Sequence, residues 1–451
     1  MKAINSILCL AVATHCWAED NSYNKDSVFT PEIPCVQISV SSENEHVSRL
    51  VNLGLQDVLF GYTERASQYF TQALTLDSDC VLAHACMLVV TPAGSDTYRH
   101  HLQELNQLMT ASMLNPVEEW YLSTLLQYVS GDLSGAATAF KERAARYRRD
   151  TMAACWDIVL NHYARTETAA SLINRADKLT ASHPENGLVH MCRALTEEYS
   201  ASPSEKGLRS AQKATELLPE NPVAHMLRGR LLALAAAPDK ALQQFELAAR
   251  YSIPSSELHL TARLSQINAR IQSGDKKLWI EALQEARKLA QESTDDTPTT
   301  DAGILLYWEG RSMLLRMLVL QETPPASQAI NMASRTCNAQ ENTPLEMMQS
   351  CLVEAIRARS LAQTDRKSTA ARCLANAEKH LQRLQRAGDL SSSMLRLCHQ
   401  RALQACTGAI LRAKIALYST TADIWKEQLA ELLASPTSRL LPPPLPHSLS
   451  H

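Results

Sequence analysis

Apolar residues recur every three or four positions through most of the chain, which is the spacing of one face of an α-helix. Short polar turns that contain Pro, Gly, Asn or Asp separate these amphipathic stretches. The turn phrase Pro-Glu-Asn returns after 35 residues, in HPENGLVHMC from His183 and in LPENPVAHML from Leu218. Because Pro ends one helix and Asn caps the next, the repeated phrase predicts a repeated pair of helices.

This pattern resembles the tetratricopeptide repeat, a helix-turn-helix unit of 34 residues. Two clear units pair a glycine on the first helix with a phenylalanine on the second, Gly54 with Phe70 and Gly229 with Phe245. The units begin near residues 47, 81, 117, 153, 187 and 222, at intervals of 34 to 36 residues. The unit near Val81 departs from the pattern, because its second helix, TYRHHLQELNQLMTA, lacks small residues where helices cross.

The resemblance implies an all-α fold, a right-handed superhelical solenoid of antiparallel helix pairs, with about six repeats followed by divergent C-terminal helical hairpins. One helix pair cannot bury its apolar stripe alone, so neighbouring pairs must stack. Within the repeats, Asn186 and Asn221 are expected to cap first helices. Asp132, Asp239 and Asp275 stand just before second helices and are expected to cap those.

The pattern divides the chain into segments of different character. We expect a signal peptide at 1–18, a polar extended segment at 19–45, the repeat array at 46–292, divergent helical repeats at 302–434 and a Pro-rich flexible tail at 435–451. Within the second segment, CVQISV forms a short strand or lies along the first helices. Ser293 to Asp301 reads as a loop. The later helices are expected near 302–320, 325–337, 344–362, 367–386, 391–418 and 421–434.

The first eighteen residues predict export. Lys2 precedes an apolar run from Ile7 to Ala13, and Ala18 stands before the acidic Glu19, which is the layout of a secretory signal peptide. The run is too short to span a bilayer, and no later stretch reaches the necessary length. We therefore expect a periplasmic or secreted protein without stable membrane insertion. A net charge of −3 gives no field that would attract nucleic acid.

Ten cysteines follow the predicted signal peptide. Cysteines on one helix are too far apart to bond, so any disulfide must link different helices. Cys337 with Cys351 and Cys155 with Cys192 are two candidate bridges. Buried free thiols are an equal alternative.

Residues with catalytic or metal-binding chemistry do not form a recognisable motif. His84, His190 and His225 occupy the same position in their units and are expected to pack, because repeats stand too far apart to share one metal ion. His100 and His101 are adjacent and point in different directions. The acidic pairs Glu118–Glu119 and Glu197–Glu198 are expected on solvated helix faces. The sequence predicts no catalytic residue, no metal site and no cofactor.

The predicted functional feature is a surface. In the family that the chain resembles, three positions of each first helix line the concave face. Carried over to this sequence, they include the partner-binding candidates Tyr121, Leu125, Tyr128, Met191, Met226 and Arg230. Aromatic residues, Met and Arg suit the capture of an extended peptide or a partner helix. Replacing the two tyrosines by Ala is expected to weaken that capture without loss of helix.

The sequence therefore predicts an exported, non-catalytic scaffold that binds a protein or peptide partner on its concave face. Two alternatives stay open. One is an accessory protein or enzyme that acts on envelope glycans or other polymers. Two carboxylates about 5 to 9 Å apart in a cleft would support this alternative. The other is a component of an envelope secretion or pilus assembly system.

Overall fold

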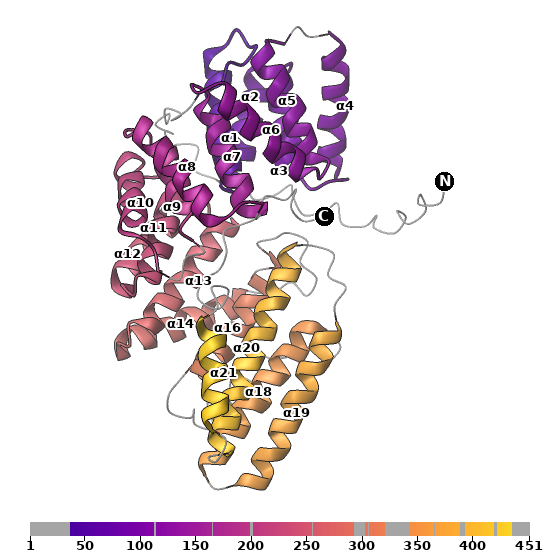
Figure 1. Cartoon of the computed structure of the whole chain (residues 1–451). Coiled ribbons are helices and arrows are strands. Elements are labelled where there is room, and N and C mark those ends of the chain that lie inside the picture. Colours follow the sequence, from indigo (N-terminus) through magenta and orange to yellow (C-terminus); the bar gives the residue numbers. More distant parts are fainter. Residues whose placement is uncertain are drawn as a thin grey trace. The chain divides into compact units, whose positions relative to one another are not determined.

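The computed structural model describes residues 37–111, 114–164, 166–198, 202–254, 256–292, 303–304, 306–320, 343–364, 366–387, 393–418 and 422–434. Among these residues every regular element is a helix, and the helices pack in neighbouring pairs (Figure 1). The predicted signal peptide, Cys35, the loop from Ser293, the helix near 325–337 with Cys337, and the tail from 435 lie outside the described residues. None of the described helices is long and apolar enough to cross a membrane.

Six helix pairs follow one another from the start of the described chain. Their first helices are α1 (Glu45–Leu59), α3 (Val81–Val90), α5 (Pro116–Val129), α7 (Thr151–Ala164), α9 (Gly187–Leu195) and α11 (Pro222–Leu234). Their second helices are α2 (Thr63–Leu76), α4 (Asp96–Ala111), α6 (Leu133–Arg146), α8 (Ala169–Ser182), α10 (Glu205–Leu217) and α12 (Pro238–Tyr251). The predicted unit starts agree with the starts of the first helices to within two residues, so this periodicity is confirmed.

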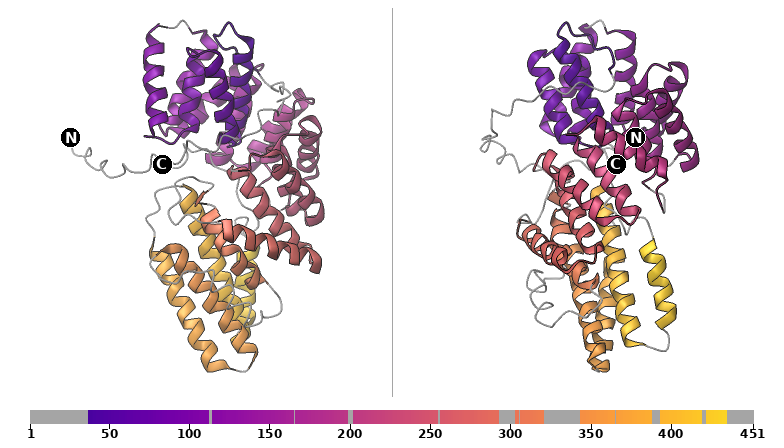
Figure 2. Two further views of the ribbon diagram at one scale, coloured as in Figure 1. Left: turned by 180° about the vertical axis from the view of Figure 1, so that it is seen from behind. Right: turned by 90° about the vertical axis from the view of Figure 1, so that its left-hand side faces the viewer.

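Seven more helices are described after the six pairs. They are α13 (Glu257–Gln272), α14 (Lys276–Glu292), α16 (Arg311–Leu320), α18 (Pro344–Gln363), α19 (Lys367–Arg386), α20 (Ser393–Leu417) and α21 (Ala422–Ala434). Three of them, α18, α19 and α20, have 20 or more residues. A short π-helical turn, Leu306–Gly310, leads into α16. Figure 2 shows α18 and α19 as a long hairpin, which α20 joins. Most core residues up to α13 form one buried cluster, and those from α13 onwards form another.

The two glycine-phenylalanine pairs explain how the helices of one unit come close. A Cβ atom added to Gly229 would lie 2.5 Å from the ring of Phe245, and one added to Gly54 would collide with the ring of Phe70. Both rings are at most 1% exposed. The predicted role of the glycines as sites of close approach is therefore confirmed.

Four of the five predicted N-cap residues accept hydrogen bonds from amides in the first turn of their helices. Asn186 accepts from Val189 N, and Asn221 accepts from Val223 N and Ala224 N. Asp132 and Asp275 likewise accept from amides in the first turns of α6 and α14. The prediction was wrong for Asp239, which lies inside α12. Pro238 fixes a helical φ at the first position there, so the helix begins two residues earlier than an Asp239 cap would place it.

Residues 37–44, before α1, lie along the helices and form no strand. Ile38 N donates to Asn52 Oδ1 at 2.7 Å, and Asn52 Nδ2 donates to Ile38 O at 3.1 Å. Ile38 and Val40 are buried. A buried asparagine on α1 thus satisfies the backbone that a strand partner would otherwise pair with.

One helix of the array is packed differently from the others. In the other five pairs the second helix packs on the next helix along the chain, as α2 does on α3 and α6 does on α7. Over the described residues, α5 packs on α3 instead, and α4 packs closely only on α3. Figure 1 shows α4 at the margin of the N-terminal helices. This is the helix whose sequence lacks small residues.

Candidate functional site

The six side chains predicted to line a partner-binding groove are buried. Tyr121, Leu125 and Tyr128 are 0% exposed, and Met191, Met226 and Arg230 are 1% exposed. In this structure they belong to the core, so they are not accessible to a partner at the molecular surface. Their role in binding stays a prediction, which requires the surrounding packing to open.

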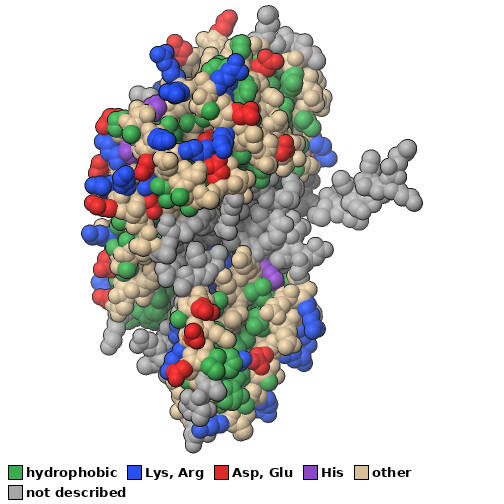
Figure 3. Space-filling view, in the orientation of Figure 1, with side chains coloured by type: hydrophobic (Ala, Val, Ile, Leu, Met, Phe, Trp, Pro, Cys, Tyr) green, Lys and Arg blue, Asp and Glu red, His purple; other side chains and the backbone are tan. Residues whose placement is uncertain are grey.

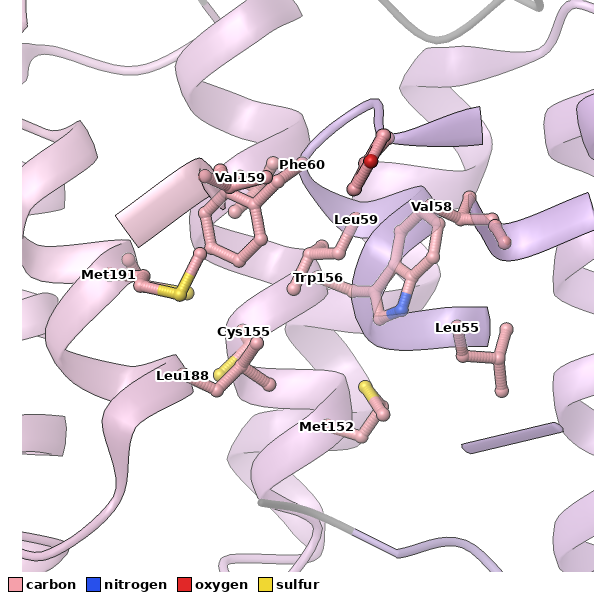
Figure 4. Close-up of a cluster of buried hydrophobic side chains, with 14 of the residues drawn as sticks. Leu55, Val58, Leu59, Phe60, Met152, Cys155, Trp156, Val159, Leu188 and Met191 are labelled. Carbon is pink, nitrogen blue, oxygen red and sulfur yellow. The ribbon is translucent and has the colours of Figure 1, made fainter. Parts of the chain in front are cut away.

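Packing between distant units contributes to this burial, as it does at Met191. Leu55, Val58, Leu59 and Phe60, at the end of α1, face side chains of α7 and α9 (Figure 4). Phe60 lies beside Val159 and Met191, and Trp156 extends toward α1. All of these side chains are buried. Around Met191, the face that the resemblance assigns to a partner is therefore filled by the chain's own first helix.

The two tyrosines are held by specific neighbours. The hydroxyl of Tyr121 donates to Asp150 Oδ1 at 2.6 Å. Burial, and then the Asp150 carboxylate, raise the pKa of Tyr121 well above its usual value. The ring of Tyr128 meets Trp156 edge-on at 5.8 Å, and Trp156 in turn stacks on Phe140 at 5.2 Å. These contacts are typical of an aromatic core.

Arg230 belongs to a buried ionic group. Its Nη1 donates to Glu198 Oε1 at 2.5 Å, and Glu198 Oε2 lies 4.0 Å from His162 Nε2. Burial opposes the ionisation of Glu198, but Arg230 and His162 outweigh it and lower the pKa of the carboxyl. The carboxylate is thus ionised and paired in the core, where removing one partner costs several kcal/mol, about 3–5.

The prediction that the acidic pairs mark solvated faces was wrong for three of four residues. Glu118 is 1% exposed, Glu197 2% and Glu198 5%; Glu119 alone is exposed. Glu197 pairs with Arg193 at 2.7 Å and accepts from the backbone of Ser204 at 3.1 Å. Ion pairs with Arg193 and Arg230 compensate the burial of Glu197 and Glu198, whereas Glu118 accepts from Ser41 N at 2.8 Å. Glu197 and Glu198 are therefore committed to structural pairs.

The recurring histidines are buried, as predicted, and share one interaction. His84 Nε2 lies 2.9 Å from Ser78 O, His190 Nε2 lies 2.8 Å from Pro184 O, and His225 Nε2 lies 2.7 Å from Pro219 O. In each case the carbonyl belongs to the residue six positions earlier, in the turn between units. Each histidine thus ties the start of its helix to the preceding turn.

Two of the histidines form a direct pair. His84 Nδ1 lies 3.0 Å from His101 Nδ1. Because a carbonyl accepts from His84 Nε2, the neutral His84 ring can only accept at Nδ1, so His101 donates there. Burial, and then His84 and His100, lower the pKa of His101 to about 4. His100 is exposed, and its ring centroid lies 5.1 Å from that of His101.

The cysteines form two close pairs of thiols. Cys155 and Cys192, one of the predicted pairings, share a side-chain hydrogen bond, as do Cys351 and Cys406. All four are buried and present as free thiols. The hydrogen bond to Cys192, and then burial, raise the pKa of Cys155 well above its usual value. Sequence spacing alone did not indicate Cys406 as the neighbour of Cys351.

The exposed face of α4 is the feature that sequence reasoning did not assign. Leu102 is 37% exposed and Met109 is 48% exposed, seven positions apart on the same side of the helix. Asn106 lies between them, and Arg99 and Gln103 flank them, all exposed. The missing small residues in this helix were the available signal, since a helix without them packs less closely on a neighbour.

The chemistry of the described surface and of possible metal ligands can be stated in part. No group of three or more His, Cys, Asp or Glu side chains within the described residues is arranged to hold a metal ion. On the face shown in Figure 3, basic and acidic side chains are interspersed over the part of the array that carries α8 to α12. Comparisons of this chain with protein-family models and with curated proteins found no match.

Proposed function

We propose that this chain is a non-catalytic helical-repeat scaffold of the tetratricopeptide type, and that its task is to bind another protein. The regular spacing of the helix pairs, the two glycine-phenylalanine contacts and the shared histidine interaction support a repeat. A stack of repeats offers an extended surface for recognition. The signal-peptide pattern at 1–18 supports action in the periplasm or outside the cell.

The observation that carries the proposal is the outer face of α4, defined by Arg99, Leu102, Gln103, Asn106 and Met109. Among the described residues no further helix packs closely on it, whereas the next helix covers the second helix of each other pair. Leu102 and Met109 expose large apolar side chains there. Exposed apolar groups rimmed by polar residues are typical of protein-binding surfaces.

The partner that fits this face is an amphipathic helix of another protein. Leu102, Asn106 and Met109 are spaced at i, i+4 and i+7, which forms a ridge that a partner helix can pack against. Elsewhere in the array the equivalent position is filled by the first helix of the next unit, so the geometry is that of a helix-accepting surface. A methionine side chain adapts to the shape of its partner.

The proposal is tested by affinity capture from the source cells with matched variants. Leu102→Asp/Met109→Asp places two charges on the outer face of α4, and Ile280→Asp places one on α14, where the side chain is 56% exposed. We expect the wild type and Ile280→Asp to capture the same proteins and the α4 variant to lose a defined subset. Identical capture by all three would refute the proposal, as would a wild-type dimer that the α4 variant disrupts.

A further inference from the structure

A cavity lies among α13, α16, α20 and α21, away from the outer face of α4. Its volume is about 140 Å³. Its apolar lining consists of Ile271, Met313, Met317, Val319, Leu429 and Leu432, with Ala405 and Gly408. Such a space is close to the roughly 150 Å³ of an apolar cavity known to hold one benzene molecule. The cavity is therefore large enough for a small organic molecule.

The polar lining consists of three arginines and of the neutral Asn268 and Gln404, so within the described chain its only charges are positive. The arginines are Arg316, Arg401 and Arg412, and no Asp or Glu among the described residues lines the cavity. Arg401 is 8% exposed, and the side chain of Arg316 is 14% exposed. Guanidinium groups with this little exposure to water need compensation by negative charge or by hydrogen-bond acceptors.

One carboxylate is shared between two of these arginines. Glu309, in the π-helical turn before α16, is 1% exposed and pairs with Arg316 through Oε2. Its Oε1 forms a longer ion pair with Arg401 Nη1, at 3.5 Å, and neither of these two atoms has a hydrogen bond within the described residues. Glu309 therefore pairs more closely with Arg316 than with Arg401.

Each of the two arginines has a buried N–H group that makes no hydrogen bond to another described residue. Within the described part of the chain, neither Arg316 Nε nor Arg401 Nη1 has a hydrogen-bond acceptor, although both atoms are buried. Burial, opposed in part by Glu309 and reinforced by Arg316, lowers the pKa of Arg401. Two guanidinium groups and one carboxylate leave an excess positive charge at the edge of the cavity.

We propose that this cavity binds a small organic carboxylate, with the carboxylate on Arg401 and Arg316 and the apolar body against Met313, Met317 and Leu432. The planar guanidinium group matches a carboxylate and can donate two parallel hydrogen bonds to it. An inorganic anion satisfies the charge but leaves the apolar lining without contact. The site is independent of the outer face of α4.

The binding test uses benzoate, whose ring matches the size of the cavity, and calorimetric titration of the full chain. Benzamide has the same shape without the charge, and sulfate has charge without the ring. We expect saturable binding of benzoate, at least about tenfold weaker binding of benzamide, and no competition by sulfate at matched ionic strength. Equal binding of benzoate and benzamide, or displacement of benzoate by sulfate, overturns the proposal.

Variants locate the site. Arg401→Met should weaken benzoate binding at least about tenfold, whereas Arg209→Met, which alters an exposed arginine on α10, should leave it unchanged. Gly408→Leu keeps every arginine and fills the cavity, since a Cβ there meets Leu432 at 3.4 Å in ordinary contact. It should abolish binding with the helical circular dichroism retained. If Arg401→Met does not fold, Gly408→Leu decides: wild-type affinity in that variant contradicts the proposal.

Discussion

His225 Nε2 lies 2.7 Å from the carbonyl oxygen of Pro219, the proline of the repeated Pro-Glu-Asn turn. His190 and Pro184 make the same contact one unit earlier. The proline ends one helix and cannot continue it, Asn221 caps the next, and the histidine four residues beyond the cap binds the turn carbonyl. The recurring Pro-Glu-Asn motif and the histidine that follows it thus end one helix, cap the next and link the two units by a hydrogen bond.

Replacing His225 by Leu should destabilise the protein by about 1–3 kcal/mol, because the Pro219 carbonyl loses its donor in a partly buried turn. Urea denaturation followed by circular dichroism measures the change. His46→Leu is the matched control, since His46 is exposed at the start of α1. Equal stability of both variants and the wild type would mean that the histidine contact contributes nothing.

Gly229→Ala should cost about 1–3 kcal/mol of unfolding free energy, because the added methyl group collides with the ring of Phe245. Phe245→Leu removes the ring with which the methyl group collides, and by itself it also lowers the free energy of unfolding. The double variant should therefore be more stable than the sum of the two single effects predicts. Strict additivity in this double-mutant cycle would show that the two residues do not meet as the structure has them.

Tyr128→Ala should reduce stability by about 3–5 kcal/mol, because it empties a fully buried site beside Trp156. Tyr121→Ala should also be destabilising, since it leaves Asp150 without a donor. The sequence alone predicts weaker partner capture with no loss of fold for the two variants. The structure predicts a loss of stability, and thermal unfolding distinguishes the two outcomes. Unchanged melting temperatures for both variants would show that the two side chains are not core residues.

The His84–His101 pair makes stability depend on pH. An unfolded histidine has a pKa of about 6.5, whereas that of folded His101 is about 4. As the pH falls from 6.5 toward 4, the unfolded state takes up the proton first, so the free energy of unfolding decreases over that window. His101→Gln should flatten this decrease, and His100→Gln, at an exposed position, should not. An NMR titration that gives His101 a pKa near 6.5 would contradict the pairing.

Much of the helical framework could be predicted because its signals are local. The starts of the first helices follow from apolar spacing and from caps such as Asn186 and Asn221. The glycine-phenylalanine contacts lie within one unit, between residues 16 positions apart. Asp239 shows the limit even of local reasoning, since the competing proline beside it decides where α12 begins.

The candidate site could not be predicted to the same extent because it depends on contacts between distant units. Nothing in the spacing of α1 indicates that Leu55 and Phe60 pack against α7 and α9 (Figure 4). The burial of Glu198 likewise depends on Arg230, 32 residues away. Only the departure of α4 from the repeat pattern was visible beforehand, and that departure coincides with the exposed face of the helix.

The most direct test of the scaffold proposal is site-specific photo-crosslinking in the source cells. A crosslinking residue at Met109, on the outer face of α4, is compared with one at Ile280 on α14; both positions expose a large apolar side chain. We expect a covalent adduct to a different polypeptide at position 109 and none at 280. Adducts of equal yield at both positions, or an adduct at 109 only to a second copy of this chain, would contradict the account.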